Sequence, residues 1–313
     1  MLGKTAGGLF WMFRYLERSE NTARILNAGF RIALTRTATS EDEWSSILTT
    51  SGMRETYLLH YDKFDADSVI NYLLRDKKNP SSVIVVSEAA RNNARLVRTA
   101  LTREVWEAVN ENWINLSEAL SRPVRQKELP AVLGLIRQQS ALVRGALHGT
   151  MLRNDVFDFS RLGTFLERAD NTARILDVKY HVLLPSVSLV GSSLDNVQWE
   201  TILRSVSALN SFKSISGGEL TPREIADFLI LDKRVPRSLG FCVGKIATNL
   251  DYLAKDYGLE LPCHTRVKTL KEELAEITID TIIEDGLHEF LGDFITNVTQ
   301  LGQQIEVDYR FSS

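Results

Sequence analysis

A twelve-residue segment occurs twice in this chain, 150 positions apart. Residues 15–26 read YLERSENTARIL and residues 165–176 read FLERADNTARIL, so nine of the twelve positions are identical. A repeat at a fixed offset constrains the fold more strongly than local propensity does, because each copy must be able to form the same structural unit. The repeat therefore predicts a chain built from two copies of one unit.

The similarity extends beyond this segment. Two further pairs of blocks match in the same order at offsets of 155 and 156, namely Trp44 with Trp199 and residues 72–83 with 228–239. Conserved order with slightly growing offsets is what duplication followed by small insertions produces. We therefore expect a first pseudo-repeat over residues 1–150 and a second over 151–313, packed together as one domain.

The sequence pattern within each copy is typical of helices. Capping residues at Asp65 and Thr221 precede apolar runs, and Pro80 and Pro236 follow the ends of those runs. Residues 82–86 are rich enough in β-branched side chains to suggest a short strand, but the aligned residues of the second copy are not. Further runs have apolar residues at i, i+3, i+4 and i+7, at about residues 87–120, 129–150, 241–256, 265–283 and 286–306. We predict an all-α helical bundle of about ten helices.

A polar stripe marks the repeated helix. At 100° per residue, Glu17, Asn21 and Arg24 fall on one narrow face, while most of the remaining surface is apolar. The second copy repeats the stripe with Glu167, Asn171 and Arg174. Charged groups on such a helix are at least partly buried and each requires a partner. Arg24 and Arg174 can pair along their own helices with the acids four residues before them. If a pseudo-twofold axis relates the copies, Glu17 meets Arg168 or Arg174, and Glu167 meets Arg18 or Arg24.

Three interpretations of this stripe remain open. The first is a buried ion-pair and amide network that fixes how the copies dock. The second is a pocket that binds a carboxylate or phosphate through its guanidinium groups. The third is an active site in which the carboxylates act as general acids or bases. The candidate catalytic residues are Glu17 and Glu167, and the candidate ligand-binding residues are Arg18, Asn21, Arg24, Arg168, Asn171 and Arg174.

Composition excludes several classes of function. The chain has a net charge of -3 and a pI near 6.0, which gives no electrostatic reason to expect a nucleic-acid partner or an anionic membrane. No apolar segment is long enough to span a membrane. The only cysteines, Cys242 and Cys263, lack any paired spacing, so we expect a reducing, cytoplasmic location. The sequence leaves a homo-oligomer open.

Known cofactor motifs are missing as well. Glu284 and His288 are four residues apart, but one such pair is common by chance, so no metal site is predicted. Neither a Gly-rich phosphate loop nor a GxSxG elbow occurs, and no cofactor is expected. Asp155 and Asp158 are isolated acids, which we interpret as the first turn of a helix.

The doubled LERxxNTARIL pattern resembles the Alpha-E family of bacterial proteins, which is named for a predicted α-helical domain with an E-R motif. Glu17-Arg18 and Glu167-Arg168 match that motif, and the resemblance covers essentially the whole chain. Members of the family are typically encoded beside ATP-grasp amide ligases and transglutaminase-like proteins, and the family has no established activity. The resemblance implies partners of these two kinds and a role in making or modifying peptides.

Together, these observations favour a non-catalytic accessory, scaffold or ligand-binding protein of a peptide-synthesis or peptide-modification system. The competing hypothesis is a helical enzyme with a Glu/Arg active site between the repeats, acting on a substrate that carries a carboxylate or phosphate. A closed, fully paired network would favour the structural interpretation. An open cleft with unpaired arginines would favour a ligand site.

Overall fold

The computed structural model describes residues 1–33, 40–183, 193–217 and 220–312. Within these ranges the chain forms fifteen α-helices and one short 3-10 helix, and no strand. The first half contains α1 (Gly3–Ala33), α2 (Ser40–Thr50), α3 (Arg54–Leu58), α4 (Ala66–Leu74), α5 (Val83–Leu96), η1 (Arg98–Ala100), α6 (Arg103–Ala119) and α7 (Leu129–Thr150). The second contains α8 (Asp155–Leu183), α9 (Ser193–Ser205), α10 (Leu209–Ile215), α11 (Pro222–Ile230), α12 (Leu239–Tyr257), α13 (Pro262–Glu276), α14 (Ile279–Asp285) and α15 (Leu287–Asp308).

The all-α prediction is confirmed, but the described helices outnumber the ten that were expected. Two predicted runs are each split in two, because Thr102 caps α6 by accepting from Val105 N, and Thr278 caps α14 by accepting from Thr281 N. Short helices of five to seven residues, α3 and α10, add to the number. A hydroxyl that offers a local hydrogen bond ends a run that hydrophobic periodicity alone would continue.

Residues 82–86, the suggested strand, begin α5 instead. Val83 and Val86 are fully buried there, so tertiary packing overrides their β propensity. The caps predicted at Asp65 and Thr221 are confirmed: Asp65 accepts from Ser68 N at the start of α4, and Thr221 accepts from Glu224 N at the start of α11.

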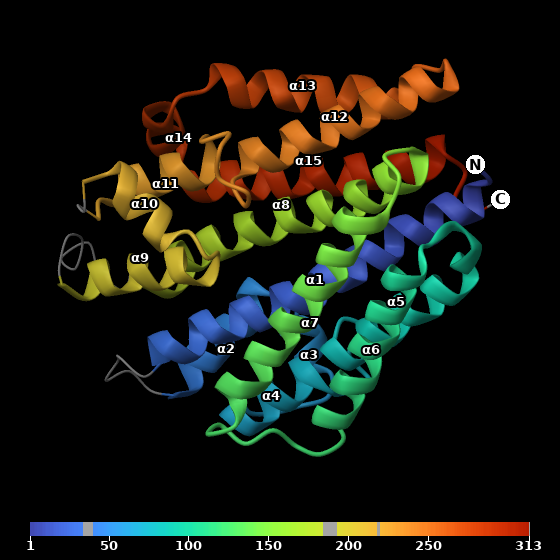
Figure 1. The fold of residues 1–313 in the computed structure, drawn as a ribbon. Helices are drawn as coiled ribbons and strands as arrows, with labels where there is room; N and C mark the ends of the chain where they lie inside the picture. Colours follow the sequence, from blue (N-terminus) through green and yellow to red (C-terminus); the bar gives the residue numbers. More distant parts are fainter. Residues whose placement is uncertain (34–39, 184–192, 218–219, 313) are drawn as a thin grey trace.

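The two longest helices, α1 and α8, pack against each other in the middle of the molecule (Figure 1). The blue-to-teal helices of the first half lie on one side of this pair, and α12, α13 and α15 lie on the other. α1 contacts α5 and α7, α8 contacts α12 and α15, and the contacts of α2 with α8 are matched by those of α9 with α1. The division into pseudo-repeats at residue 150 stays a prediction, which this matched packing supports.

One hydrophobic core spans both halves. Phe10 and Leu16 of α1 belong to the same buried cluster as Leu166 of α8 and Leu250 of α12. Where α1 and α8 cross, a Cβ added to Gly163 would fall on the carbonyl oxygen of Phe10. The two backbones therefore approach closely because residue 163 has no side chain. This approach brings the polar stripes of α1 and α8 together.

Candidate functional site

The two E-R motifs pair with each other across the α1–α8 contact. Arg168 donates from Nε and Nη2 to the two carboxylate oxygens of Glu17, at 2.9 and 3.0 Å. Arg18 donates in the same way to Glu167, at 2.5 and 2.9 Å. Both carboxylates are buried. Of the partners that the pseudo-twofold argument left open, the structure therefore has Arg168 for Glu17 and Arg18 for Glu167.

Arg24 and Arg174 pair along their own helices, which was the i, i+4 alternative. Arg24 donates to Glu20 Oε1 at 2.9 and 2.7 Å, and its Nη1 reaches the Ser205 carbonyl at 2.6 Å. Arg174 donates to both oxygens of Asp170, at 2.8 and 3.1 Å. Neither arginine meets the glutamate of the opposite stripe.

The two asparagines of the stripes differ in their contacts. Asn21 donates from Nδ2 to the Glu167 carbonyl at 3.2 Å and accepts from Arg237 at 3.4 Å. Asn171 is equally buried, yet neither atom of its amide has a hydrogen-bond partner in the part of the chain that the structure describes. An unsatisfied buried amide is costly, so Asn171 is a place where a water or a ligand would be stabilised.

Three arginines outside the proposed set also belong to the site. Arg237 contacts Glu17 Oε1 at 3.0 Å and Glu20 Oε1 at 2.7 Å, Arg144 of α7 donates to Glu20 Oε2, and Arg14 donates to Glu167 at 3.0 Å. Arg14 had a visible signal, since it flanks the stripe on the same helix, whereas Arg144 had none. Arg237 follows Pro236 in the repeated block at the position of Ser81, a difference between the copies that could have indicated it.

Charge in this cluster is unbalanced. Glu17 and Glu20 together serve four guanidinium groups, those of Arg24, Arg144, Arg168 and Arg237. Burial by itself would raise the pKa of Glu17, but the surrounding arginines hold that pKa far below its usual range. Burial, together with the neighbouring arginines, lowers the pKa of Arg237 to about 10 in spite of Glu17. The cluster therefore carries excess positive charge.

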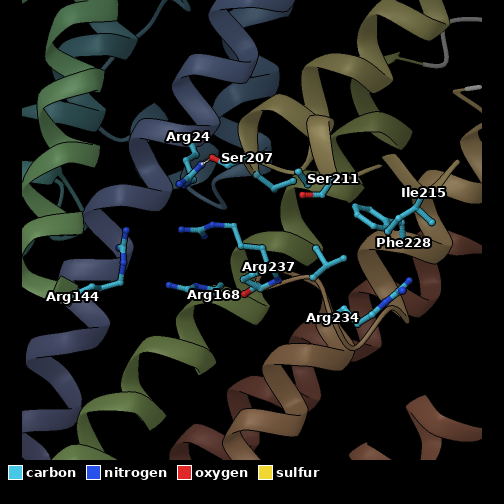
Figure 2. A pocket seen from close by; sticks show the side chains of 13 residues that line it. Arg24, Arg144, Arg168, Ser207, Ser211, Ile215, Phe228, Arg234 and Arg237 are labelled. Carbon is cyan, nitrogen blue, oxygen red and sulfur yellow. Dashed lines mark hydrogen bonds between the residues drawn. The ribbon is translucent and has the colours of Figure 1, made fainter. Parts of the chain in front are cut away.

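A cavity of about 340 Å³ opens on this cluster (Figure 2). Figure 2 shows Arg24, Arg144 and Arg168 at one end and Ile215, Phe228 and Arg234 at the other. The cavity thus has one end lined by three arginines and another end where Ile215 and Phe228 offer apolar surface beside Arg234. Its lining consists of Arg24, Arg144, Arg168, Val206, Ser207, Ala208, Ser211, Ile215, Phe228, Arg234, Val235, Pro236 and Arg237.

A second cavity, of about 280 Å³, has several lining residues that align with those of the first. Arg18 and Arg174 take the places that Arg168 and Arg24 have in the first, and Ser81 takes that of Arg237. Asn171 also lines it. Because Ser81 carries no charge, this second cavity has fewer cations than the first.

Comparison with known proteins decides the family. The model of the Alpha-E family, described as a predicted alpha-helical domain with a conserved ER motif, matches residues 1–309. The chain belongs to the Alpha-E family. In this member, the glutamate and arginine of each E-R motif are the ion-pair partners of the arginine and glutamate of the other.

Two relatives of this Alpha-E protein are an uncharacterised protein of Mycobacterium bovis and one of Mycobacterium tuberculosis. Each is 22% identical to the chain over 330 aligned positions, which cover 94% of the chain but 36% of the relative. The chain thus spans about a third of the length of these relatives. No solved structure matches it.

None of the helices in the described ranges combines the length and apolar character needed to cross a membrane. No group of three or more His, Cys, Asp or Glu side chains in those ranges is placed to hold a metal ion.

The lowered carboxylate pKa values predict loss of stability in acid. Burial alone would raise the pKa of Glu167, but Arg18 and Arg14 lower it to about 2, and the pKa values of Glu17 and Glu20 are also lowered. A depressed folded-state pKa stabilises the protein above the ordinary value of 4.5 and ceases to do so as pH falls toward the folded value. We expect the urea midpoint to decrease steadily as pH is lowered from about 4.5 to about 2. A midpoint that does not change over this range would contradict the assignment.

Proposed function

We propose that this protein is a non-catalytic, ligand-binding accessory or scaffold component of a cytoplasmic peptide-synthesis or peptide-modification system. The observation that carries the ligand-binding part is the unbalanced cavity, where four guanidinium groups share two carboxylates. A bound anion would neutralise the excess charge. Family membership is what supports the accessory part.

The donors around the cavity suit a carboxylate or a phosphate. Among the described residues, Arg144 uses only Nη1 for its ion pairs, and Nε of Arg237 has no partner. Nη1 of Arg168 has only a long contact of 3.4 Å, to the Pro236 carbonyl. Planar guanidinium groups with spare N–H donors favour forked binding of an anion's oxygen atoms. Phe228 and Ile215 at the other end would contact an apolar part of the same ligand.

The alternative, an enzyme with Glu17 and Glu167 as acid-base groups, has less physical support. A general acid or base works best with a pKa near the working pH, whereas the pKa of Glu167 is about 2 and that of Glu17 is also strongly lowered. Both carboxylates are already bound in forked ion pairs. Such groups stay ionised at neutral pH and have little capacity to exchange protons.

Replacing Arg237 tests the cavity. Arg237→Ser installs the residue that the first copy has at the aligned position, Ser81, and removes one cation from the lining. Because charge-assisted hydrogen bonds contribute about 1.5–3 kcal/mol each, we expect phenylacetate and inorganic phosphate to bind about ten- to a hundredfold more weakly. Isothermal titration calorimetry measures this change.

The matched control is Arg204→Ser. Arg204 forms an exposed i, i+4 pair with Glu200 and is not part of the cavity lining, so its loss removes the same charge elsewhere. Equal weakening by both variants would show a nonspecific effect of net charge. Absence of binding of either anion to the unaltered protein would contradict the ligand-binding proposal.

The accessory role needs a separate experiment. We propose that an ATP-grasp amide ligase and a transglutaminase-like protein encoded near the gene are the partners, on the strength of the family resemblance. Co-purification of the chain with such a ligase, followed by ligase assays with and without the chain, tests this. A ligase that neither binds the chain nor changes its rate would overturn the accessory role and leave anion binding unaffected.

A further inference from the structure

One buried carboxylate outside the E-R motifs has no side-chain partner among the residues that the structure describes. Asp158 lies in the first turn of α8, as the sequence predicted, and its residue surface is only 5% exposed. It forms no ion pair or hydrogen bond through its side chain with the residues that the structure describes. Burying a carboxylate without a partner is unfavourable, so such a group points to a ligand that supplies one.

Asp158 lines a cavity of about 360 Å³ between α8 and α12. This volume falls within the range of small-molecule sites. The cavity is separate from the arginine-rich one, since the two share no lining residue. Its lining consists of Arg153, Phe157, Asp158, Arg161, Lys245, Thr248, Asn249, Tyr252 and Asp256.

The aligned position in the first half carries no carboxylate. Gly8 aligns with Asp158 at the offset of 150. A Cβ on Gly8 would meet the Val97 side chain at 2.5 Å, so no larger residue fits there without a shift. Gly8 lines a cavity of its own together with Trp11, which aligns with Arg161. The second half thus has charged side chains at positions where the first half has none.

The charges of the cavity are of both signs and are not paired internally. Arg161 lies over the rings of Phe157 and Phe165, at 5.4 and 4.8 Å, and Lys245 lies 5.1 Å from the ring of Phe241. Neither cation has an ion pair with a carboxylate of the described residues. Asp256 likewise has no ion pair with a cation of those residues. Burial and then Asp256 raise the pKa of Asp158 to about 7, while Arg161 opposes this shift.

The charges that line this cavity favour one class of ligand. An isolated metal ion or a simple amine would be repelled by Arg153, Arg161 and Lys245, and a simple anion would be repelled by Asp158 and Asp256. A molecule with both an ammonium and a carboxylate satisfies both sets. Tyr252 can contact its apolar part.

We propose that this cavity is a second ligand site that binds a small zwitterion of the amino-acid class. The ammonium group lies against Asp158 and Asp256, and the carboxylate lies against Arg161 and Lys245. Asn249, whose Nδ2 already donates to the Lys245 carbonyl, offers its amide oxygen to the ammonium group. The site is independent of the arginine-rich cavity and of the proposed accessory role.

The test compares three probes of similar shape by ligand-detected NMR and calorimetry. L-phenylalanine carries both charges, phenethylamine only the ammonium, and phenylacetate only the carboxylate. We expect L-phenylalanine to bind at least about tenfold more tightly than phenethylamine, because each satisfied charge contributes a charge-assisted bond. Binding of phenylalanine no tighter than that of the amine would overturn the proposal.

Variants connect the binding to the cavity. Asp158→Asn should weaken phenylalanine binding by about tenfold or more, whereas Asp251→Asn, an exposed acid on α12 outside the lining, should leave it unchanged. Arg237→Ser should also leave it unchanged, so a failure here is distinct from a failure of the anion-binding proposal. Equal binding by the Asp158→Asn protein would assign the ligand to another surface.

Stability gives a second measure that does not depend on a ligand. The raised pKa of Asp158 means that ionisation destabilises the folded protein as pH rises from about 4 through about 7. The charged groups facing Asp158 are Asp155 and Arg161 on α8, Arg153 before it, and Lys245 and Asp256 on α12. Asp158→Asn should therefore raise the melting temperature near pH 8.5 by a few degrees and change it little near pH 4. A lower melting temperature at pH 8.5 would show that Asp158 has a structural partner, which would overturn the inference.

Discussion

Replacement of Glu17 by glutamine is expected to lower the free energy of unfolding by about 3–5 kcal/mol, the cost of breaking a buried ion pair by removing one partner. Glu17 is paired with Arg168 through both oxygens and lies 3.0 Å from Arg237 and 3.6 Å from Arg144. Without the charge of Glu17, these arginines depend on Glu20 alone. Urea denaturation near neutral pH measures the change through the transition midpoint at constant slope.

The matched control is Glu107→Gln on α6. Glu107 forms an i, i+4 pair with Arg103 in which both side chains are largely exposed, so its loss should cost no more than about 0.5 kcal/mol. If Glu17→Gln costs as little as this control, the ion pairs of the E-R motifs between α1 and α8, here called the seam, do not hold the halves together. In that case, the guanidinium groups of the seam would serve ligand binding alone.

The second large effect is expected for Gly163→Ala, which should reduce the free energy of unfolding by about 3 kcal/mol, at the upper end of the usual cost of overpacking. The added methyl group would fall on the carbonyl oxygen of Phe10 and lie 3.2 Å from the amide nitrogen of Arg14. Both are backbone atoms of α1, so no rotamer change relieves the clash and the two helices must separate. Separation would also lengthen the forked pairs of the E-R motifs.

Two glycines of α7 provide the control for this substitution. Nothing lies within 4 Å of a Cβ built on Gly134 or Gly145, so alanine there meets no obstacle. Alanine favours the helix over glycine by about 0.5–1 kcal/mol, and each control should be slightly stabilising. The opposite signs at Gly163 and Gly134, measured by the same thermal or urea unfolding, would locate the effect in the helix crossing. A Gly163→Ala protein as stable as its parent would contradict the described approach of α1 and α8.

Helical periodicity could predict much of this arrangement from the sequence. It indicated the all-α class, and the stripe on the repeated helix identified Glu17 and Glu167 as charges that need partners. The pairing of these two with Arg168 and Arg18 was one of the alternatives open at that stage, because periodicity states which face a residue occupies but not which residue it meets. Only the crossing of α1 and α8 decides between two arginines that lie six residues apart on one helix.

The contributions of Arg237 and Arg144 could not be predicted in this way. Arg237 lies just before α12, and Arg144 lies on α7, so both reach the seam through tertiary contacts that no local pattern encodes. The burial of Asp158 could not be predicted from the sequence either. As an acid in the first turn of a helix it is ordinary in sequence, and only the structure shows that it is buried beside a cavity.

The reciprocal pairing of the E-R motifs is compatible with more than one oligomeric state. Each carboxylate is served by an arginine of the other half, and only residues 151–154 join α7 to α8. The same pairs, with the same geometry, would form if the first half of one molecule met the second half of another. Domain swapping, in which two protomers exchange identical elements, is a low-cost route to dimers. The ion pairs thus specify which surfaces meet, while the linker and the protein concentration govern whether those surfaces belong to one polypeptide or two.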